Sequence, residues 1–413
     1  MDSGGGRAPW PYDEKPLIVF WETTKACLLK CKHCRAEAIL KALPGELTTE
    51  EGYRLIDEIR AFGRPYPLLV LTGGDPLMRS DFWDLLDYAV RGGLRVAVAP
   101  AVTPLLTRET AARMARAGVS AVSLSLDSPY PEVHDSIRGV EGTWKRTVEA
   151  IRWFMDEGVR VQVNTVVMRD TVEGLPDMVK LLLDLGVKTW EVFYLVPTGR
   201  AGFELDLTPS EWEDVSHFLY EASKYGLMIR TTEGPMFRRV AIIRRFLESR
   251  GAVSLLKGET GPLYERLVGR LRRILGPPRG PPLAHTVGTR DGRGIVFVDY
   301  KGNVYPSGFL PVPAGNVRVK SLVEIYRSST LFTMLRRGGA LEGRCGKCEF
   351  REICGGSRAR AFAYYKRVTA EDPACPYRPG RYTEILSRIG ASVEEAIREA
   401  AASSRPLHAS AGR

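Results

Sequence analysis

Three cysteines near the start of the chain have the spacing of a metal-cluster site. Cys27, Cys31 and Cys34 form the pattern C-x3-C-x2-C, shortly after an apolar run at 17–21. A [4Fe–4S] cluster is normally held by four thiolates, so three cysteines would leave one iron without a protein ligand. An open position of this kind distinguishes a catalytic metal site from a closed structural one. A zinc site is the alternative, with His33 as the fourth ligand.

A second group of cysteines lies near the other end of the chain, and no cysteine lies between Cys34 and Cys345. Four thiolates can complete the coordination of zinc or of an iron–sulfur cluster, and the spacing leaves both open. Two tight groups in a long chain predict metal sites in a reducing cytoplasm, since a disulfide framework would spread its cysteines through a short secreted chain. The second group consists of Cys345, Cys348, Cys354 and Cys375.

A paired-glycine segment follows the second apolar run of the chain. It reads Gly73-Gly74-Asp75-Pro76, directly after the run at 68–72. Paired glycines let the backbone approach a ligand closely, and backbone carbonyls could accept hydrogen bonds from an ammonium group. A plain turn is the alternative interpretation.

Two further polar sites lie in or just after apolar runs. Ser125 and Asp127 end the fourth run, and a hydroxyl and a carboxylate there would suit the polar groups of a nucleoside. Asn164 is a polar exception inside the fifth run, where a satisfied core residue is the alternative.

Alternating β-rich and helical patterns must position these residues. Most of the β-rich runs are continuously apolar, as strands buried on both faces of a parallel sheet should be. Six such units predict a parallel α/β barrel or a doubly wound sheet, with function at the carboxyl ends of the strands. The expected strands are 17–21, 68–72, 95–99, 121–126, 161–167 and 190–196, with helices near 49–62, 80–92, 107–117, 143–157, 173–185 and 208–226.

Length and composition predict a globular protein of two domains. The chain has 413 residues, of which 44% are hydrophobic and 26% charged. The net charge of +10 comes from scattered side chains and indicates a solvated basic surface, not a nucleic-acid site. No apolar run approaches the roughly 20 residues of a membrane span. The glycine-rich start lacks a signal-peptide core, so we expect a cytoplasmic protein.

A cysteine-rich module is expected after the barrel. A Pro/Gly-rich stretch at 276–282 marks a linker, and 295–299 with 303–305 reads as a hairpin. The predicted division is a flexible tail at 1–12, a barrel at 13–230, a helical insert and linker at 231–290, the module at 291–380, and a closing helix (383–400) with a tail at 381–413.

These motifs together resemble the radical S-adenosylmethionine (SAM) superfamily, and the second cysteine group resembles its SPASM extension. The resemblance implies an α/β fold, with a partial (β/α)6 parallel barrel followed by a small cysteine-rich α+β domain. It implies that the open iron binds SAM, and that one electron cleaves SAM to a 5'-deoxyadenosyl radical that abstracts hydrogen from the substrate.

The resemblance also implies roles for individual residues. The Gly-Gly-Asp-Pro segment matches the superfamily's Gly-Gly-Glu-Pro motif, which contacts the amino group of SAM, with Asp in place of Glu. Arg138 matches an arginine that can pair with the SAM carboxylate. His33 stands where an aromatic residue often packs near adenine. The implied SAM-binding residues are His33, Gly73, Gly74, Asp75, Pro76, Ser125, Asp127, Arg138 and Asn164.

The C-terminal cysteines match the ligands of one auxiliary [4Fe–4S] cluster of the SPASM extension. Ser307 and Arg358 stand where the ligands of a second auxiliary cluster would be expected. We therefore predict two clusters in total.

The C-terminal motifs also indicate a substrate class. Segments 354–361 and 370–375 are similar to those of the alternative haem-biosynthesis enzymes, which include a haem synthase that decarboxylates iron-coproporphyrin and a didecarboxysirohaem deacetylase. The short segment before the first strand favours this tetrapyrrole group over maturases that crosslink ribosomal peptides through thioether or carbon–carbon bonds. A ferredoxin or flavodoxin is the expected electron donor. A non-catalytic iron–sulfur redox or sensor protein is the remaining alternative, but it would need no nucleoside site.

Overall fold

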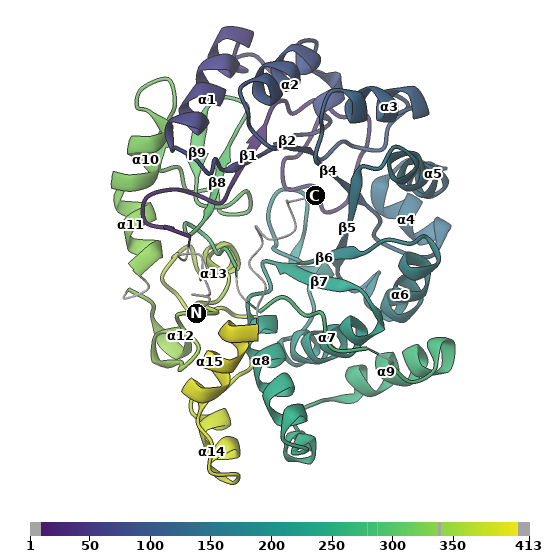
Figure 1. The fold of residues 1–413 in the computed structure, drawn as a ribbon, viewed down its shortest axis with the longest axis vertical. Helices are drawn as coiled ribbons and strands as arrows, with labels where there is room; N and C mark the ends of the chain where they lie inside the picture. The colour runs from purple at the N-terminus through teal and green to yellow at the C-terminus, as the bar shows by residue number, and fades with distance from the viewer. Residues whose placement is uncertain (1–9, 279, 287, 338–339, 404–413) are drawn as a thin grey trace, which may run out of the picture.

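The computed structural model describes residues 10–403 apart from 279, 287, 338 and 339. Its centre is one ten-stranded sheet with the order β10-β9-β8-β1-β2-β3-β4-β5-β6-β7. Strands β1 to β7 are parallel and neighbours in chain order, so they curve into the predicted partial barrel (Figure 1). The strands are β1 Ile18–Glu22, β2 Leu68–Thr72, β3 Val96–Val98, β4 Ala121–Ser125, β5 Arg160–Val167, β6 Thr189–Tyr194, β7 Met228–Thr232, β8 Ile295–Val298, β9 Asn303–Tyr305 and β10 Gly315–Asn316.

Four strands extend the six-strand sheet that the sequence predicts, β7 at one edge and β8, β9 and β10 at the other. β7 adds a seventh parallel strand beside β6. It escaped prediction because its sequence, Met-Ile-Arg-Thr-Thr, has no apolar run. β8 belongs to the predicted C-terminal hairpin and pairs in parallel with β1, from Ile18 opposite Ile295 to Trp21 opposite Val298. The C-terminal module is therefore joined to the barrel through the same sheet.

Helices cover the outer face of this sheet in Figure 1. α1 begins with a capping box at Thr48 and Glu51, and it buries Leu55, Ile56 and Ile59 against the strands. The helices are α1 Thr49–Ala61, α2 Phe82–Arg91, α3 Arg108–Arg116, α4 Pro131–Arg138, α5 Thr143–Asp156, α6 Leu175–Asp184, α7 Pro209–Ala222, α8 Met236–Ser249, α9 Pro262–Leu275, α10 Leu322–Ser328, α11 Thr330–Arg337, α12 Gly343–Lys347, α13 Arg358–Tyr365, α14 Arg381–Ser387 and α15 Val393–Ser403.

The segment at 231–290, which was expected to be a helical insert and linker, contributes helices to the hydrophobic core. Phe237 of α8 and Leu267 of α9 are buried in the main hydrophobic core. The single closing helix expected at 383–400 is instead two helices, α14 and α15. Gly390 lies between them at φ +69°, a conformation that glycine adopts readily and that ends a helix.

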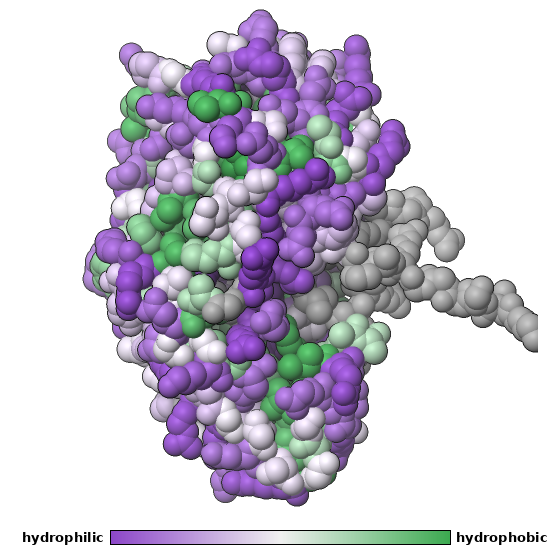
Figure 2. Space-filling model, turned by 90° about the vertical axis from the view of Figure 1, so that its left-hand side faces the viewer, coloured by the Kyte–Doolittle hydropathy of each residue, from purple (hydrophilic) through white to green (hydrophobic). Residues whose placement is uncertain are grey.

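The face shown in Figure 2 is mostly hydrophilic, with apolar side chains in small patches. No helix in the part of the chain that the structure describes is long and apolar enough to cross a membrane.

Side chains of the barrel strands alternate between the outer core and the inside of the barrel. On β6, Trp190 and Val192 are fully buried in the core under the helices, so Glu191 between them points inward. Pairing between strands places residues of one face side by side. One inward row across four strands is Ser125, Asn164, Glu191 and Arg230.

Candidate active site

The first three cysteines lie on the loop that follows β1. The loop is fixed by backbone hydrogen bonds, such as that from the Cys27 amide to the Ile39 carbonyl at 2.7 Å. Cys27 and Cys31 are buried and Cys34 is partly exposed. The thiols pack against an apolar lining that consists of Leu29, Ala38, Ala101 and Val140.

The surroundings of these thiols suit thiolate ligands of a metal cluster. Burial raises the pKa of the Cys27 thiol to about 12, so a charged sulfur needs compensation here. Backbone amides supply part of it, because Leu29 N–H donates to Cys27 Sγ at 3.4 Å and Ala38 N–H donates to Cys34 Sγ at 3.4 Å. Hydrogen bonds of this kind also tune iron–sulfur clusters.

The Gly-Gly-Asp-Pro segment lies directly against the cysteine loop. Gly74 N–H donates to the Thr24 carbonyl at 2.8 Å, and Asp75 N–H donates to the Ala26 carbonyl at 2.7 Å. A Cβ atom at Gly73 would lie 2.6 Å from the Thr24 oxygen, and one at Gly74 would lie 2.4 Å from the Ala26 oxygen. Only glycine fits at these two positions, since each added carbon would collide with backbone.

The side chain of Asp75 is buried beneath that segment. Its carboxylate accepts from Thr103 Oγ1 at 2.8 Å and from Leu77 N–H at 3.1 Å, while Pro76 starts a short 3₁₀ turn. Burial raises the pKa of Asp75 to about 6. The carboxylate therefore shapes the turn, and backbone atoms are what the segment presents to a ligand.

Asp127 is the centre of a buried polar cluster beyond β4. Its Oδ2 lies 2.7 Å from an Arg138 guanidinium nitrogen and 3.1 Å from His33 Nε2, and its Oδ1 accepts from Val166 N–H at 3.1 Å. Burial alone would raise the pKa of Asp127, but the Arg138 guanidinium and His33 hold it well below its usual range. Both oxygens of this carboxylate already have partners within the protein. Asp127 therefore positions Arg138 and His33.

Arg138 connects this cluster to the cysteine loop. Its second terminal nitrogen donates to Cys31 Sγ at 3.6 Å. Among the described residues, its Nε is buried without a hydrogen-bond partner, and so is Nε2 of His134, whose Nδ1 accepts from the Asp127 amide at 3.1 Å. Unpaired buried polar atoms need an explanation, and a polar ligand that accepts a hydrogen bond from Arg138 would supply one.

Ser125 and Asn164 lie side by side in the inward row. Both are partly exposed, and the Asn164 amide oxygen accepts from Gln162 Nε2 at 2.9 Å. Asn164 is thus on the barrel interior and not in the apolar core. The structure brings the Gly-Gly-Asp-Pro segment, His33, Asp127 and Arg138 together around the cysteine loop, and it pairs Ser125 with Asn164 in the inward row of the barrel.

The four C-terminal cysteines line a single cavity next to α12 and α13. Burial raises the pKa of Cys348 to about 11 and that of Cys375 to about 12. Asp372 N–H donates to Cys345 Sγ at 3.3 Å and Gly356 N–H donates to Cys354 Sγ at 3.5 Å. Four thiolate donors with amide hydrogen bonds fit a cluster bound entirely by protein ligands.

Ser307 and Arg358 take part in hydrogen bonds at the positions where a second auxiliary cluster would need ligands. Ser307 Oγ donates to Glu233 Oε1 at 2.8 Å, and Ser357 Oγ donates to Glu233 Oε2 at 2.5 Å. Arg358 donates to the Val368 carbonyl at 3.0 Å. Glu233, at the end of β7, has φ +56°. Its carboxylate is held between the barrel and the module.

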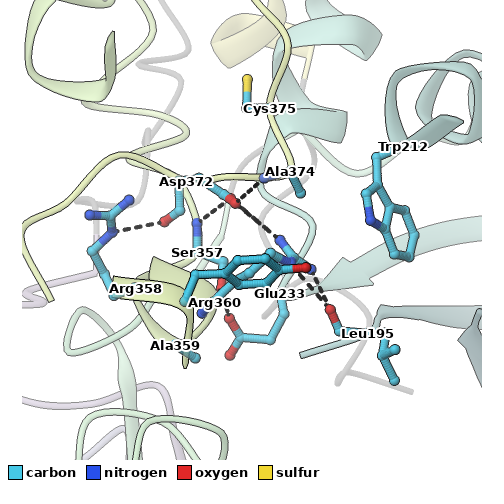
Figure 3. A network of polar contacts seen from close by, with 12 residues as sticks. Leu195, Trp212, Glu233, Ser357, Arg358, Ala359, Arg360, Asp372, Ala374 and Cys375 are labelled. Atoms are coloured by element: carbon cyan, nitrogen blue, oxygen red, sulfur yellow. Dashed lines mark hydrogen bonds and ion pairs between the residues drawn. The ribbon is translucent and has the colours of Figure 1, made fainter. Parts of the chain in front are cut away.

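Arg360 completes the connection between the barrel and the module, as Figure 3 shows. Its guanidinium donates twice to the Leu195 carbonyl beyond β6, at 3.1 and 2.9 Å, and pairs with Asp372 at 3.3 Å. The sequence by itself assigned no role to Glu233, Arg360 or Asp372. Their only signal is charge in segments near cysteines or a strand end, which many surface residues share.

Comparison with known proteins agrees with this geometry. Residues 21–182 match the Radical SAM superfamily model and residues 290–349 match SPASM, an iron-sulfur cluster-binding domain. The second match favours an iron–sulfur cluster over zinc at the C-terminal cysteines, although Cys354 and Cys375 lie outside it.

Two similar relatives extend over most of the chain. The "AdoMet-dependent heme synthase" of Oleidesulfovibrio alaskensis is 37% identical over 88% of this chain and 87% of the relative. The protein of the same name from Methanosarcina barkeri is 35% identical over 89% of this chain and 98% of the relative. The solved structure "Native anSMEcpe with bound AdoMet" shares the fold, with a TM-score of 0.60 and 15% identity over 94% of this chain and 99% of that one.

A radical SAM enzyme of this class uses a [4Fe–4S] cluster, SAM and an auxiliary cluster, and both cysteine sites described above have the donors for them. The chain belongs to the radical SAM superfamily, as a SPASM-type enzyme of the alternative haem-biosynthesis group.

Proposed function

We propose that this enzyme modifies a carboxylated tetrapyrrole, and that its reaction is the oxidative decarboxylation of propionate side chains of iron-coproporphyrin. The observation that carries the proposal is the similarity to the two heme synthases, which covers 88% and 89% of this chain. The hydrogen bonds of Arg360 support it, because they hold the module that carries the second cysteine site against the barrel beyond β6.

Cys27, Cys31 and Cys34 hold the first cluster in this proposal, and Cys345, Cys348, Cys354 and Cys375 hold the auxiliary one. When bound, the first cluster and SAM supply a hydrogen-abstracting radical, and the auxiliary cluster offers a destination for the electron that decarboxylation releases.

Residues around the cysteine loop bind and orient SAM. The backbone at Gly73 and Gly74 presents carbonyl groups to the SAM amino group, and Arg138 offers its unpaired Nε to the carboxylate. Asp127 holds the Arg138 guanidinium in place at 2.7 Å. Ser125 and Asn164 are the inward-facing polar groups for the ribose.

The proposed reaction removes one hydrogen atom, one CO₂ and one electron from each propionate that reacts. One hydrogen atom leaves the β-carbon of a propionate, the bond to the carboxylate breaks to release CO₂, and one electron leaves, so that a vinyl group remains. The protein's share is to place that β-carbon and to exclude water. A ferredoxin or flavodoxin of the cytoplasm is the proposed source of the electron that starts each cycle.

An anaerobic assay tests the proposal. The reconstituted enzyme is incubated with SAM, dithionite and either iron-coproporphyrin or didecarboxysirohaem, and the products are read by mass spectrometry. We expect 5'-deoxyadenosine and loss of CO₂ with two hydrogens from each reacting propionate of iron-coproporphyrin. Products from didecarboxysirohaem alone would move the assignment to deacetylation. Absence of 5'-deoxyadenosine in fully loaded preparations would favour a redox or sensor protein.

A further inference from the structure

An arginine inside the barrel has no hydrogen-bond or ion-pair partner among the described residues. Arg230 lies on β7 in the inward row, directly opposite Glu191 of β6 and two strands from Asn164. Its side chain is partly buried, and its Nε is buried and unpaired in the part of the chain that the structure describes. An unpaired cation that is shielded from water is costly, so proteins that keep one usually give it an anionic partner.

The neighbouring carboxylate does not serve as that partner. Glu191 accepts a hydrogen bond from Thr232 Oγ1 at 2.8 Å and forms no ion pair with Arg230 within 4.0 Å, in the part of the chain that the structure describes. Burial raises the pKa of Glu191, because the nearby guanidinium compensates its charge only in part. Arg230 is therefore available to another anion.

More nitrogen donors surround the same part of the barrel. His285 lies beside β7, because the preceding Ala284 pairs with Ile229 of that strand. Its Nε2 is also buried, with no hydrogen-bond partner among the described residues. A carbon atom placed on Gly288 would lie 3.3 Å from that Nε2 and 3.6 Å from Arg238 Nη2, so these two donors converge. Burial and the two nearby arginines lower the pKa of His285 to about 3, which leaves it neutral as a hydrogen-bond donor.

Arg293 and Arg238 add positive charge to this region, and they differ in how tightly their guanidinium groups are held. The Arg293 guanidinium is partly exposed and lies over the Tyr12 ring, 4.5 Å from its centre. Arg238 is buried and held by the carbonyls of Ile353 at 3.0 Å and Thr289 at 2.5 Å. Arg238 therefore supplies fixed charge, whereas Arg230 and Arg293 have donors to spare.

We propose that Arg230, with His285 beside it, binds a carboxylate of the substrate inside the barrel. This inference rests on the proposed function, since it names the group that holds a carboxylated tetrapyrrole. Neighbouring strands are about 4.8 Å apart, so Arg230 lies roughly 10 Å along the sheet from Asn164 in the SAM-binding row. A carboxylate bound at Arg230 does not react and serves to orient the macrocycle. A different propionate of the same substrate is then placed next to SAM.

Equilibrium binding tests this inference without turnover. The reconstituted protein is titrated with iron-coproporphyrin and with its tetramethyl ester, and the change in porphyrin absorption gives Kd. We compare wild type with Arg230→Gln, Arg230→Lys and His285→Gln, and the matched control is Arg152→Gln on the exposed face of α5. Iron content and cluster absorption verify that each variant is folded.

We expect Arg230→Gln to raise the Kd for the free acid on the order of 10- to 100-fold, which is the usual worth of a hydrogen bond to a charged group. Arg230→Lys should lose less, and Arg152→Gln should bind as wild type does. The ester should bind wild type weakly and be insensitive to Arg230→Gln.

Three results would contradict one or both proposals. Equal Kd values for the acid in wild type and Arg230→Gln would overturn this inference alone, and so would an ester that binds wild type as tightly as the acid. If Arg230→Gln does not fold, unchanged binding of the acid by His285→Gln has the same meaning. A wild type that binds neither probe would overturn the proposed tetrapyrrole substrate and this inference with it.

Discussion

Arg138 and Asp127 form a buried ion pair, with 2.7 Å between a guanidinium nitrogen and Oδ2. The pair links the carboxyl end of β4 to the loop that carries Cys31, because the same guanidinium reaches Cys31 Sγ at 3.6 Å. A positive group held this close to the thiols offsets the negative charge that a thiolate-bound cluster brings. The proposed SAM site and the first cluster site therefore share one fixed cation.

Removal of this cation should destabilise the fold as well as the site. Arg138→Met leaves the Asp127 carboxylate buried with His33 as its remaining side-chain partner. We expect a loss of about 3–5 kcal/mol in the free energy of unfolding, as for other broken buried pairs, together with weaker SAM binding. Anaerobic urea unfolding and equilibrium dialysis with SAM measure the two effects. Arg152→Met is the control, and a loss equal to that of the control would contradict the prediction.

Gly74 should not tolerate a side chain. The Cβ atom in Gly74→Ala would lie 2.4 Å from the Ala26 carbonyl oxygen, so the loop before Cys27 would have to move. We expect a large loss of SAM binding and of iron at the first site. Gly269→Ala on α9 is the matched control, because its nearest contact is a flexible Arg273 nitrogen at 3.6 Å. That change should stabilise the helix by about 0.5–1 kcal/mol. Retained SAM binding in Gly74→Ala would contradict the close approach.

Iron content should separate the two cluster sites. We expect about eight irons in each wild-type chain and about four in the triple variant Cys27→Ala, Cys31→Ala, Cys34→Ala. Replacement of Cys348 and Cys375 by Ala should remove the other four. Elemental analysis of anaerobically reconstituted protein measures this. Zinc in place of the second set of irons would be incompatible with an auxiliary cluster.

Arg360 should be needed for the stability of the module. Arg360→Met removes two hydrogen bonds to the Leu195 carbonyl and leaves Asp372 without its cation. The expected cost is about 3–5 kcal/mol in unfolding free energy. Asp372 N–H also donates to Cys345 Sγ, so auxiliary iron should be lost more readily to a chelator.

A control in the same module is Arg367→Met. Arg367 forms an exposed ion pair with Glu342 at 2.9 Å, and such pairs contribute less than about 1 kcal/mol. If both variants unfold at the same urea concentration and lose iron at the same rate, the proposed link between barrel and module is not supported.

Glu233 should make the stability depend on pH. Burial and the nearby Asp291 carboxylate raise its pKa in the folded protein, so the folded state keeps a proton that the unfolded chain releases near pH 4.3. The unfolding free energy should therefore fall as pH rises above that value, by at most about 1.4 kcal/mol per pH unit. Glu233→Gln, which cannot ionise, should flatten this slope between about pH 5 and pH 8. Urea unfolding across that range measures both slopes, and parallel curves would show that Glu233 does not carry the effect.

Much of the barrel could be predicted because most of its strands are marked by apolar runs in the local sequence. Continuous apolar runs such as 68–72 coincide with a strand of the structure, and the helix at 49–61 begins at a capping box that the sequence spells out. β7 could not be predicted in this way, since Arg230 and Thr232 face the interior of the barrel and not an apolar core. Its membership of the sheet depends on pairing with β6, which is a long-range property.

The candidate site likewise contains residues that could be predicted from the sequence and residues that could not. The spacing of Cys27, Cys31 and Cys34 indicated a cluster because all three ligands lie on one short loop. Glu233 and Arg360 carried no such signal, because their roles depend on partners far away in the sequence, Ser307 for Glu233 and Leu195 for Arg360.

The sequence by itself determined the chemistry of this protein, because short motifs hold the thiols and the close-packed glycines within single loops. Only the tertiary structure decided which charged side chains are paired and which are free. That distinction depends on burial and on contacts between distant strands, and it is what leaves Arg230 unpaired inside the barrel while Arg138 and Arg360 are bound to carboxylates.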